Sequence, residues 1–419
     1  MLVPHAFSPK ENDPDCPPHF YANGTNPQFP LFKDLMMYMQ RGCHALSSGV
    51  HKANAAIFYN AEGEWCGGAN CLFQEVATNL AESQIDYNFV PSDVLLSSSA
   101  SVKNGCLVVG QMSYDALVIS YSEVFPEVLL KVFNRFAAEG LPVIFTDNLP
   151  DRCETENNIE SICRMFTVVP TTQIASYFIE SGFTDIVFDC KYPDVRVLHL
   201  VDDLCDRYFL MNYSTECELD TYVHVSDRRE NYVEYDIWNN KLLKMKCENN
   251  GLHVILPPGN SVMIIATDDD VTYLPEKEYI KCNRILPDVN FDVSVSQNDE
   301  FIHLSHMNST DGLRNLAVEL PHFSGTVRYE GYCTLYEQVL WIDLGTVGET
   351  ATLWINDICC GNKIHTPYVF DVSSVWNKGE NHIVIEIINN PGYKKRDMFS
   401  QYLHLPPTGL LGPIEYFLQ

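Results

Sequence analysis

The sequence has no run of about 18 apolar residues, the length that a membrane-spanning helix needs. Its first residues, MLVPHAFSPK, lack the basic start and the apolar centre of a secretory signal. Basic residues are few: 27 Lys and Arg stand against 55 Asp and Glu, and the formal net charge is −28. Such a chain repels phosphate backbones, and its densest basic cluster, Lys394–Arg396, is short. We therefore expect a cytoplasmic protein that binds neither membranes nor nucleic acid.

Motifs that bind common cofactors are also missing. The 15 cysteines are odd in number and never stand in the C-x-x-C pairs of zinc sites, which indicates reduced thiols rather than a disulfide framework. No strand-like run precedes a G-x-G-x-x-G or a Walker loop, so we expect no cofactor. The acidic runs Asp202–Asp206 and Asp268–Asp270 carry the oxygen ligands that calcium prefers, but neither follows the EF-hand spacing. The sequence therefore leaves calcium binding open and assigns no metal ligand.

What the chain does have is enough apolar residues for several cores, 46% of 419 residues. Between residues 50 and 195, short apolar runs alternate with helical patterns around Leu72–Leu80 and Leu129–Phe136, the second of which stops at Gly140. The apolar runs are AAIFY (55–59), YNFV (87–90), CLVV (106–109), ALVIS (116–120) and PVIF (142–145). Strands that alternate with helices predict a doubly wound α/β domain, with a parallel sheet covered on both faces.

From residue 196 onward the helical period disappears. Runs such as RVLHLV and SVMIIAT are separated by turns, for example ENNG (248–251) and PPGN (257–260). This pattern predicts two β-sandwiches, one over residues 196–285 and one over residues 286–419. The predicted fold class is therefore multidomain, an α/β domain followed by all-β domains.

Residues 1–49 do not resemble the start of a domain. A loop rich in Pro, His and aromatic residues precedes an amphipathic helix that is predicted over 31–49, with Gly49 as its stop. His5 and His19 lie in this loop with acidic neighbours. Because such loops often close over pockets, both histidines are candidate ligand contacts.

Groups that carry hydrolytic chemistry are not placed by the sequence. Ser120 and Ser122 follow the run ALVIS, but the glycines of a G-x-S-x-G elbow are missing, so we expect a strand-to-helix turn with serine capping. Glycoside hydrolysis needs two carboxyls about 5–10 Å apart across one bond. Glu330, Glu337 and Glu386 lie in strand-like segments, where a surface position is the favoured interpretation.

The most informative stretch is ATLWINDICCGNKIHTPYVFDVSSVWNKGENHIVIEIINN, residues 351–390. Asn356-Asp357 suits a hairpin turn, Gly361 permits a backbone bend, and Gly379–Asn381 turns the chain into the strand IVIEII. Together with the preceding Asp-Leu-Gly strand end and the Pro-aromatic-x-x-Asp-Val segment, this order resembles the sugar-binding jelly-roll domain of family 2 glycoside hydrolases. The motif indicates a fold more strongly than it indicates a particular sugar.

Further segments extend the resemblance over nearly the whole chain. NPQFPLFKDLMMYMQRGCHALSSG, IDYNFVPSDVL followed by VKNGCLVVGQMSYDALVIS, and PTGLLGPIEY resemble the C-terminal half of large α-L-rhamnosidase-type enzymes, glycoside hydrolase family 106 and relatives. The resemblance implies the end of a (β/α)₈ barrel over 1–49, an amidotransferase-like domain over 50–195, a β-sandwich over 196–285 and a galactose-binding-like jelly roll over 286–419. In that family the catalytic carboxylates lie on the barrel, so no catalytic residue is carried over.

The resemblance thus implies a non-catalytic portion of a glycoside hydrolase that supports a catalytic barrel, in cis or in trans, and contacts carbohydrate. Two alternatives remain open: a free-standing carbohydrate-binding protein, and an intact small glycoside hydrolase with unidentified carboxylates. Whether the chain is an enzyme by itself is therefore undecided. Sugar faces stack on aromatic rings, and the candidates for such contacts are Trp341, Trp354, Tyr368 and Trp376, against the alternative that each packs in a core.

Overall fold

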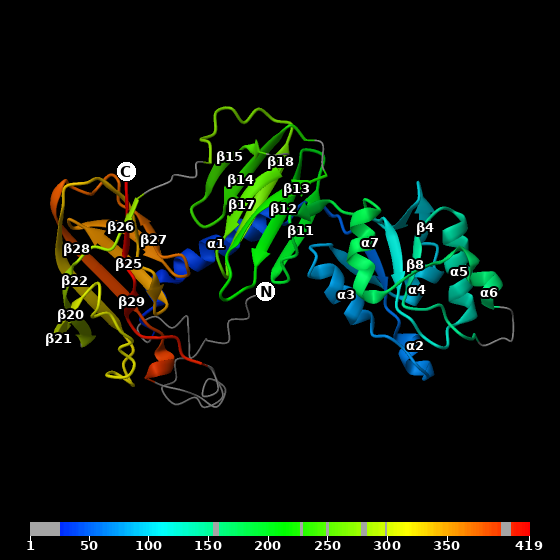
Figure 1. Cartoon of the computed structure of the whole chain (residues 1–419), viewed down its shortest axis with the longest axis horizontal. Helices are drawn as coiled ribbons and strands as arrows, with labels where there is room; N and C mark the ends of the chain where they lie inside the picture. Colours follow the sequence, from blue (N-terminus) through cyan, green and yellow to red (C-terminus); the bar gives the residue numbers. More distant parts are fainter. Residues whose placement is uncertain are drawn as a thin grey trace. The chain divides into compact units, whose positions relative to one another are not determined.

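The computed structural model describes residues 26–153, 159–226, 229–248, 251–277, 283–297, 300–394 and 404–419. Its contacts divide the chain into two compact units, one formed by Met1–Gln40 with Tyr279–Gln419 and the other by Arg41–Glu278 (Figure 1). None of the helices in the described ranges is long and apolar enough to cross a membrane. The candidate contacts His5 and His19 and the middle of the ENNG turn lie outside the described residues.

A parallel sheet lies within the second unit, as the alternating pattern predicts. Its five strands have the order β3-β2-β7-β8-β9, and every neighbouring pair is parallel. The strands are β2 (Ala55–Phe58), β3 (Tyr87–Val90), β7 (Ala116–Ile119), β8 (Val143–Thr146) and β9 (Thr167–Val169). All residues of β2, β7 and β8 are buried, because helices cover both faces of the sheet.

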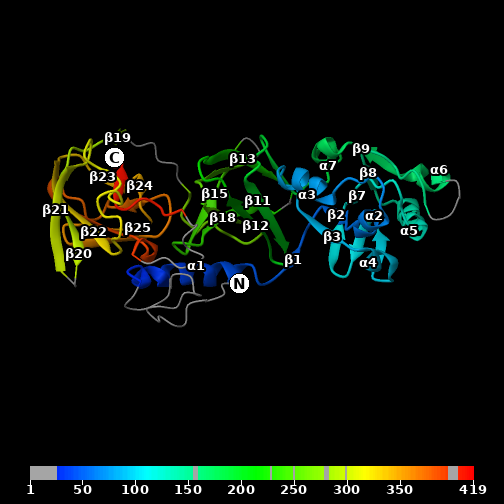
Figure 2. The same cartoon turned by 90° about the horizontal axis from the view of Figure 1, so that it is seen from below.

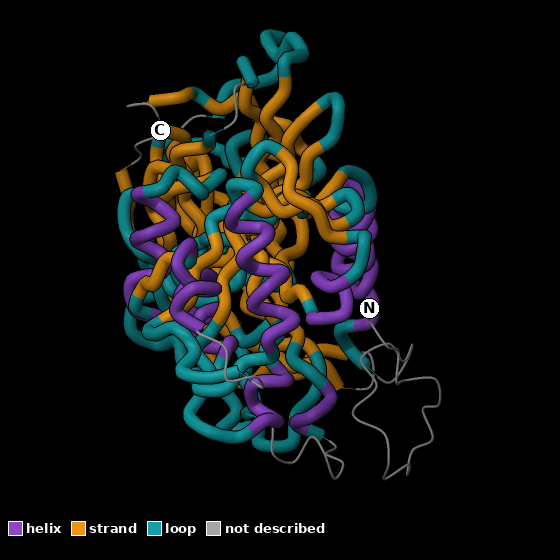
Figure 3. The backbone as a smooth tube through the Cα atoms, turned by 90° about the vertical axis from the view of Figure 1, so that its right-hand side faces the viewer, coloured by secondary structure: helices purple, strands orange, loops and turns teal. Residues whose placement is uncertain are grey.

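Each face of this sheet has a hydrophobic core of its own. The helices α3 (Phe73–Ala81) and α7 (Ile174–Glu180) pack against Ala55, Ile57 and Val118, whereas α5 (Glu127–Ala138) packs against Phe58, Ile119 and Phe145. Alternate strand residues thus enter opposite cores, as the period of two in a strand requires. Figure 3, in which this part of the chain faces the viewer, shows helices flanking the strands.

One apolar run does not join the parallel sheet. CLVV forms β5 (Cys106–Val109) of a separate antiparallel sheet with β4 (Ala100–Lys103) and β6 (Met112–Tyr114). The reason is the turn between β4 and β5, where Asn104 (φ 51°) and Gly105 (φ 82°) both have positive φ. Two such residues make the tight hairpin turn that Asn-Gly favours, and a hairpin pairs its strands antiparallel.

The remaining strands of this unit form an antiparallel β-sandwich. One sheet has the order β1-β11-β12-β18-β14-β15 and the other β10-β13-β17-β16. The strands are β1 (Val50–His51), β10 (Ile186–Phe188), β11 (Val195–Val201), β12 (Cys205–Asn212), β13 (Leu219–Val225), β14 (Asn231–Asp236), β15 (Lys241–Met245), β16 (Cys247–Glu248), β17 (Gly251–Leu256) and β18 (Ser261–Thr267). Tyr208 and Ile264 of the first sheet share a core with Val223 and Val254 of the second. Strands β1 and β10 thus pair with the sandwich although they precede residue 196.

The other unit contains a second antiparallel sandwich (Figure 1). Its large sheet has the order β21-β20-β22-β28-β25-β26 and its smaller one β19-β30-β23-β27, with a short pair β24-β29. The strands are β19 (Asn283–Ile285), β20 (Asn290–Gln297), β21 (Glu300–Asn308), β22 (Thr326–Leu335), β23 (Val339–Asp343), β24 (Thr346–Val347), β25 (Thr350–Ile355), β26 (Ile358–Lys363), β27 (Val369–Asp371), β28 (Gly379–Ile388), β29 (Leu410–Gly412) and β30 (Glu415–Leu418). Tyr329 and Ile385 from the large sheet meet Ile342, Phe370 and Tyr416 in the core.

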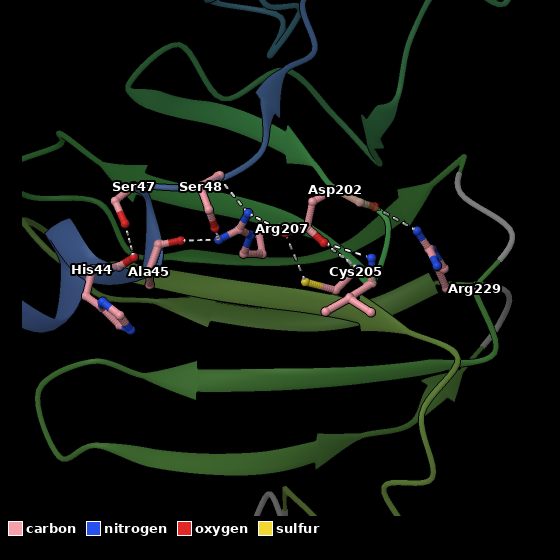
Figure 4. A network of polar contacts seen from close by, with 9 residues as sticks. His44, Ala45, Ser47, Ser48, Asp202, Cys205, Arg207 and Arg229 are labelled. Carbon is pink, nitrogen blue, oxygen red and sulfur yellow. Dashed lines mark hydrogen bonds and ion pairs between the residues drawn. The ribbon is translucent and has the colours of Figure 1, made fainter.

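Helix α1 (Phe32–Ala45) follows the first described residues and is drawn in blue in Figure 2. It contains no fully buried residue. The helix ends at Ala45 rather than at Gly49, and the turn that follows is bound to Arg207 of β12 (Figure 4). The Arg207 guanidinium donates to the backbone oxygens of Ala45 and Ser48, at 2.5 and 2.7 Å, and pairs with Asp202 at 2.8 Å.

Gly49 is needed where this turn approaches Arg207. Its φ is +90°, and a Cβ added there would lie 2.7 Å from Nη2 of Arg207 and 3.0 Å from the backbone oxygen of Val201. Gly140 has a similar φ of +97° but no atom within 4 Å of such a Cβ. Alanine at Gly140 would therefore strain only the backbone, whereas alanine at Gly49 would also collide with neighbouring atoms.

We expect Gly49→Ala to destabilise the chain more than Gly140→Ala, by about 1–3 kcal/mol, because both substitutions strain the backbone but only the first displaces a hydrogen-bonded guanidinium. Denaturant unfolding of the two variants measures the difference. In an Arg207→Ala background the extra cost of Gly49→Ala is expected to shrink, since the group it collides with is gone. Equal costs at the two glycines would show that the approach to Arg207 is not tight.

Candidate functional site

The four aromatic residues that the sequence offers as sugar contacts occupy two kinds of position. Tyr368 and Trp376 are 4% and 5% exposed and belong to the core of the second sandwich, where the rings of Trp376 and Tyr416 meet edge to face. Trp341 in β23 and Trp354 in β25 are half-buried. The second pair therefore has ring surface to offer a ligand, whereas the first pair has little.

Trp354 belongs to a row of side chains that crosses the outer side of the large sheet. By register Trp354 faces Val384, Val384 faces Glu330, and Glu330 faces Asp292. These side chains point away from the core because the residues between them, such as Ile385, point into it. We call the outward residues of β20, β22, β25 and β28 the sheet face. It comprises Asp292, Arg328, Glu330, Tyr332, Trp354, His382, Val384 and Glu386.

Tyr332 is the most exposed ring of the sheet face, at 61%. It stacks on the His382 ring, with centroids 4.9 Å apart and an interplanar angle of 25°. Nε2 of His382 lies 3.0 Å from a carboxylate oxygen of Glu330, so the imidazole that supports Tyr332 is itself held in place. The sequence reasoning missed Tyr332, although its position two residues after Glu330 in an alternating strand was a usable signal.

The other charged groups of the sheet face are also bound to one another. The Arg328 guanidinium donates to one oxygen of Glu386 at 2.5 and 2.9 Å and lies 3.8 Å from the centre of the Phe301 ring. An arginine that is stacked and ion-paired keeps a fixed orientation. The sheet face therefore combines two aromatic rings with polar groups of fixed direction, the combination that recognises a sugar ring and its hydroxyls.

A second unusual position in this sandwich is Glu349, between β24 and β25. Its φ is +125°, a region that costs a non-glycine residue about 1–3 kcal/mol. One carboxylate oxygen accepts from Nε2 of Gln28 at 2.6 Å and the other from Nδ2 of Asn390 at 2.7 Å. Burial raises the pKa of Glu349, and these two hydrogen bonds oppose the rise. Backbone strain and a buried carboxyl together mark Glu349 as a candidate for function.

Both amides beside Glu349 have fixed orientations. Oδ1 of Asn390 accepts from the backbone N–H of Gly392 at 2.7 Å, and Nε2 of Gln28 also donates to the backbone oxygen of Ile388. Each amide therefore presents its NH₂ group to Glu349, and two donors need two acceptors. The ionised carboxylate meets that need, although burial disfavours its charge.

The carboxyls with a raised pKa do not lie together in one unit of the described structure. Among the described Asp and Glu side chains, the pKa is raised for Glu349 and for Asp115, in each case chiefly by burial, and these two lie in different units. Glu386 and Glu330 are bound to basic side chains on the sheet face, and Glu337 is exposed. Each unit thus offers at most one described carboxyl with the raised pKa that a general acid needs.

The side-chain amide of Asn60 contacts both serines that follow β7, through the hydroxyl of Ser122 and the backbone oxygen of Ser120. Nδ2 of Asn60 donates to the Ser122 hydroxyl at 2.6 Å, while Oδ1 of Asn60 accepts from the backbone N–H of Gly63. A side chain that donates to a serine cannot remove its proton. The expectation that Ser120 or Ser122 caps the next helix is wrong, because α5 begins after Pro126 without a side-chain cap.

The acidic runs of the first sandwich are bound by arginines (Figure 4). Arg207 pairs with Asp202, and Arg229 pairs with Asp206 at 3.4 Å and with Asp268 at 3.0 Å. The pKa of Asp202 is lowered chiefly by the backbone N–H groups of residues 205 and 204, and to a smaller extent by the charge of Arg207. These carboxylates are thus directed at guanidinium groups.

A cavity of about 320 Å³ lies elsewhere in the second sandwich. It is lined by Leu286, Pro287, Ser309, Thr310, Asp311, Leu313, Leu411, Pro413 and Ile414. The Ser309 hydroxyl is already engaged, because it donates to the backbone oxygen of Pro287 and accepts from the N–H of Val289. With no aromatic ring in its wall, the cavity suits a sugar less well than the sheet face does.

The raised pKa of Glu349 predicts a particular pH dependence. An acid whose pKa is higher in the folded chain contributes stability at low pH and loses it as the pH rises through the folded pKa. We therefore expect Glu349→Gln to gain stability relative to the parent chain as the pH rises above about 4, the ordinary pKa of a glutamate, measured by denaturant unfolding.

Glu319→Gln is the opposite control, because hydrogen bonding to Arg314 lowers the pKa of Glu319. That carboxylate contributes stability above its unfolded pKa, so this variant is expected to lose stability relative to the parent as the pH rises. A trend of the same sign for both variants would contradict the assignment at Glu349.

In its fold, the chain is similar to a rhamnosidase from Novosphingobium sp. PP1Y, with a TM-score of 0.66 and 16% sequence identity. The match covers 95% of this chain and 42% of that one, so the chain spans less than half of the rhamnosidase. An exo-carrageenase of family GH42 from Bacteroides ovatus has a TM-score of 0.35 and 15% identity, and the match covers 51% of this chain and 29% of the carrageenase. A GH42 β-galactosidase from G. stearothermophilus has a TM-score of 0.40 and 9% identity, and the match covers 57% of this chain and 44% of the galactosidase.

The scores of the latter two carry no argument about the fold of this chain. No family model matches the chain, and no curated protein sequence matches it significantly. The fold of nearly the whole chain is thus similar to that of part of the rhamnosidase.

Proposed function

We propose that this chain is the non-catalytic C-terminal portion of a glycoside hydrolase of the α-L-rhamnosidase type. In this proposal an amidotransferase-like α/β domain and two β-sandwiches, the second a galactose-binding-like jelly roll, support a catalytic barrel in cis or in trans. The observation that supports it most is the fold likeness that covers 95% of this chain and 42% of the rhamnosidase. A chain that matches part of an enzyme along almost its whole length fits a supporting role.

The chemistry of the described side chains favours the same role. Raised carboxyl pKa values occur singly, at Asp115 and at Glu349, and the serines after β7 face an amide. Hydrolysis of a glycosidic bond requires an acid and a second carboxylate in one site. The described residues do not supply this pair, which fits a portion that supports catalysis carried out elsewhere.

The sheet face is the surface we propose for carbohydrate contact. Tyr332 and Trp354 supply ring faces, and Arg328 and Glu330 supply hydrogen-bonding groups whose directions are fixed by Glu386 and His382. Pre-formed groups of this kind lose little conformational entropy when a sugar binds. The same surface also favours the second candidate function, a free-standing carbohydrate-binding protein.

We expect the purified chain to release no nitrophenol from 4-nitrophenyl α-L-rhamnoside or β-D-galactoside. The chain is expected to be inactive because the two described carboxyls with a raised pKa, Asp115 and Glu349, lie in different units. Colorimetric assay over several hours checks this. Reproducible turnover that is lost in Glu349→Gln or Asp115→Asn would overturn the non-catalytic assignment and identify the acid.

For the binding role, we expect rhamnose- or galactose-containing oligosaccharides to bind about fivefold more weakly to Tyr332→Ala than to the parent chain, since an aromatic platform contributes of the order of 1 kcal/mol. Titration calorimetry measures the affinity. Tyr336→Ala is the matched control, because Tyr336 is 75% exposed but lies outside the sheet face. No heat with any oligosaccharide, or equal losses in both variants, would remove the sheet face as a sugar site.

A further inference from the structure

The pairing of β21 with β20, at the edge of the large sheet, contains an irregularity. Val293 faces Ser305, but the next residue of β20, Ser294, faces His303 rather than Leu304. Leu304 is therefore an extra residue in β21, a β-bulge. A bulge shifts the alternation of side chains on its own strand, so residues on either side of it change their relative faces.

This bulge places two histidines on one face. His303 and His306 are three residues apart, a spacing that directs side chains to opposite faces of a regular strand. With Leu304 inserted between them, both lie beside Asp292, which faces His306 directly. Their rings are in contact, with centroids 4.9 Å apart.

The three side chains converge through atoms that bind metals. Nδ1 of His303 lies 2.5 Å from Oδ1 of Asp292, and Nδ1 of His306 lies 3.9 Å from the same oxygen. One ligand atom from each residue falls within 4.8 Å of the other two. Zinc holds nitrogen and oxygen ligands at about 2.0–2.2 Å, which separates neighbouring ligands of a tetrahedral site by roughly 3.3 Å. To bind zinc, Nδ1 of His303 has to move away from Oδ1 of Asp292, and Nδ1 of His306 has to move toward it. All three side chains are exposed, so they can make these movements.

We propose that Asp292, His303 and His306 form a binding site for a zinc(II) ion. Two imidazoles and one carboxylate are a ligand set that zinc accepts, with solvent in the fourth position. Among the described residues this is the one group of three His, Cys, Asp or Glu side chains whose ligand atoms converge in this way. The ion would fasten the edge strand β21 to β20.

The surroundings of the cluster suit a cation. Glu330 of β22 lies opposite Asp292 of β20 and adds negative charge to the same face of the sheet. The nearest arginine by register, Arg328, faces Ser294, but its guanidinium is directed at Glu386 and the Phe301 ring. No described basic residue other than the two histidines pairs with Asp292.

The test is titration of the metal-free chain with zinc chloride in competition with a fluorescent chelator. Exposed cysteines also bind zinc, so the accessible thiols are first alkylated with iodoacetamide. We expect one zinc ion per chain. His306→Gln and Asp292→Asn are each expected to weaken binding at least about tenfold, the loss that removal of even an outer partner of a metal site can cause. His322→Gln, which changes another exposed histidine of the same unit, is expected to bind like the parent.

Hydrogen exchange provides a second readout that does not depend on affinity alone. Zinc is expected to slow amide exchange in residues 300–308 of the parent chain and of His322→Gln, but not of His306→Gln. All three substituted side chains are exposed, so the variants are expected to keep the far-ultraviolet circular dichroism of the parent. Absence of stoichiometric zinc binding, or binding that neither substitution weakens, would overturn the proposal. Neither result depends on whether the chain binds sugar.

Discussion

The antiparallel pairing of β22 with β28 determines which side chains of the second sandwich face its core and which face outward. The register runs from Thr326 opposite Ile388 to Leu335 opposite Gly379 without interruption. Because side chains alternate along a strand, a slip of one residue would exchange the two faces. Tyr329 would then leave the core, and Glu330 would enter it. Strands β20 and β25 pair with the outer edges of β22 and β28, so the sheet face inherits its composition from this one register.

Local chemistry explains why much of this sandwich could be predicted from the sequence. The hairpin expected at Asn356-Asp357 is present, with φ of 51° and 65°, and Gly361 has the positive φ of a bend. Asn356 also contacts the neighbouring strand, because its side chain accepts from the N–H of His382 and donates to Asn381. The Asn381 side chain in turn accepts from the backbone N–H of Asn377, which closes the predicted turn. Turn residues act on their own backbone, and such effects are visible in a single sequence.

Features that depend on distant partners were not visible there. The bulge at Leu304 exists because β21 and β20 pair on both sides of it, and no residue of FIHLSHMN announces it. The strain at Glu349 depends on Gln28 and Asn390, which are far from it in sequence but supply its two hydrogen bonds. The segment CLVV differs, because the Asn-Gly turn before it is a local signal that favours a hairpin over a place in the parallel sheet. For the bulge and for Glu349, by contrast, the missing information was a contact with a segment distant in sequence.

The carboxylates of the second sandwich have two different environments, and each environment suits a different chemistry. On the sheet face, Glu330 and Glu386 already accept from His382 and Arg328, so they act as fixed acceptors that hold their neighbours in place. Glu349 is the opposite case, since its carboxyl is bound by neutral amides and its burial disfavours charge. General acid catalysis needs a buried carboxyl whose charge is disfavoured, beside a second carboxylate. Sugar recognition instead needs polar groups of fixed direction beside an exposed ring. In the second sandwich, the carboxylates that are paired with basic side chains lie on the surface that carries Tyr332 and Trp354. Glu349 lies apart from them and binds Gln28, in the segment that leads into α1. The proposed role in recognition and support depends on this arrangement of the side chains of the second sandwich.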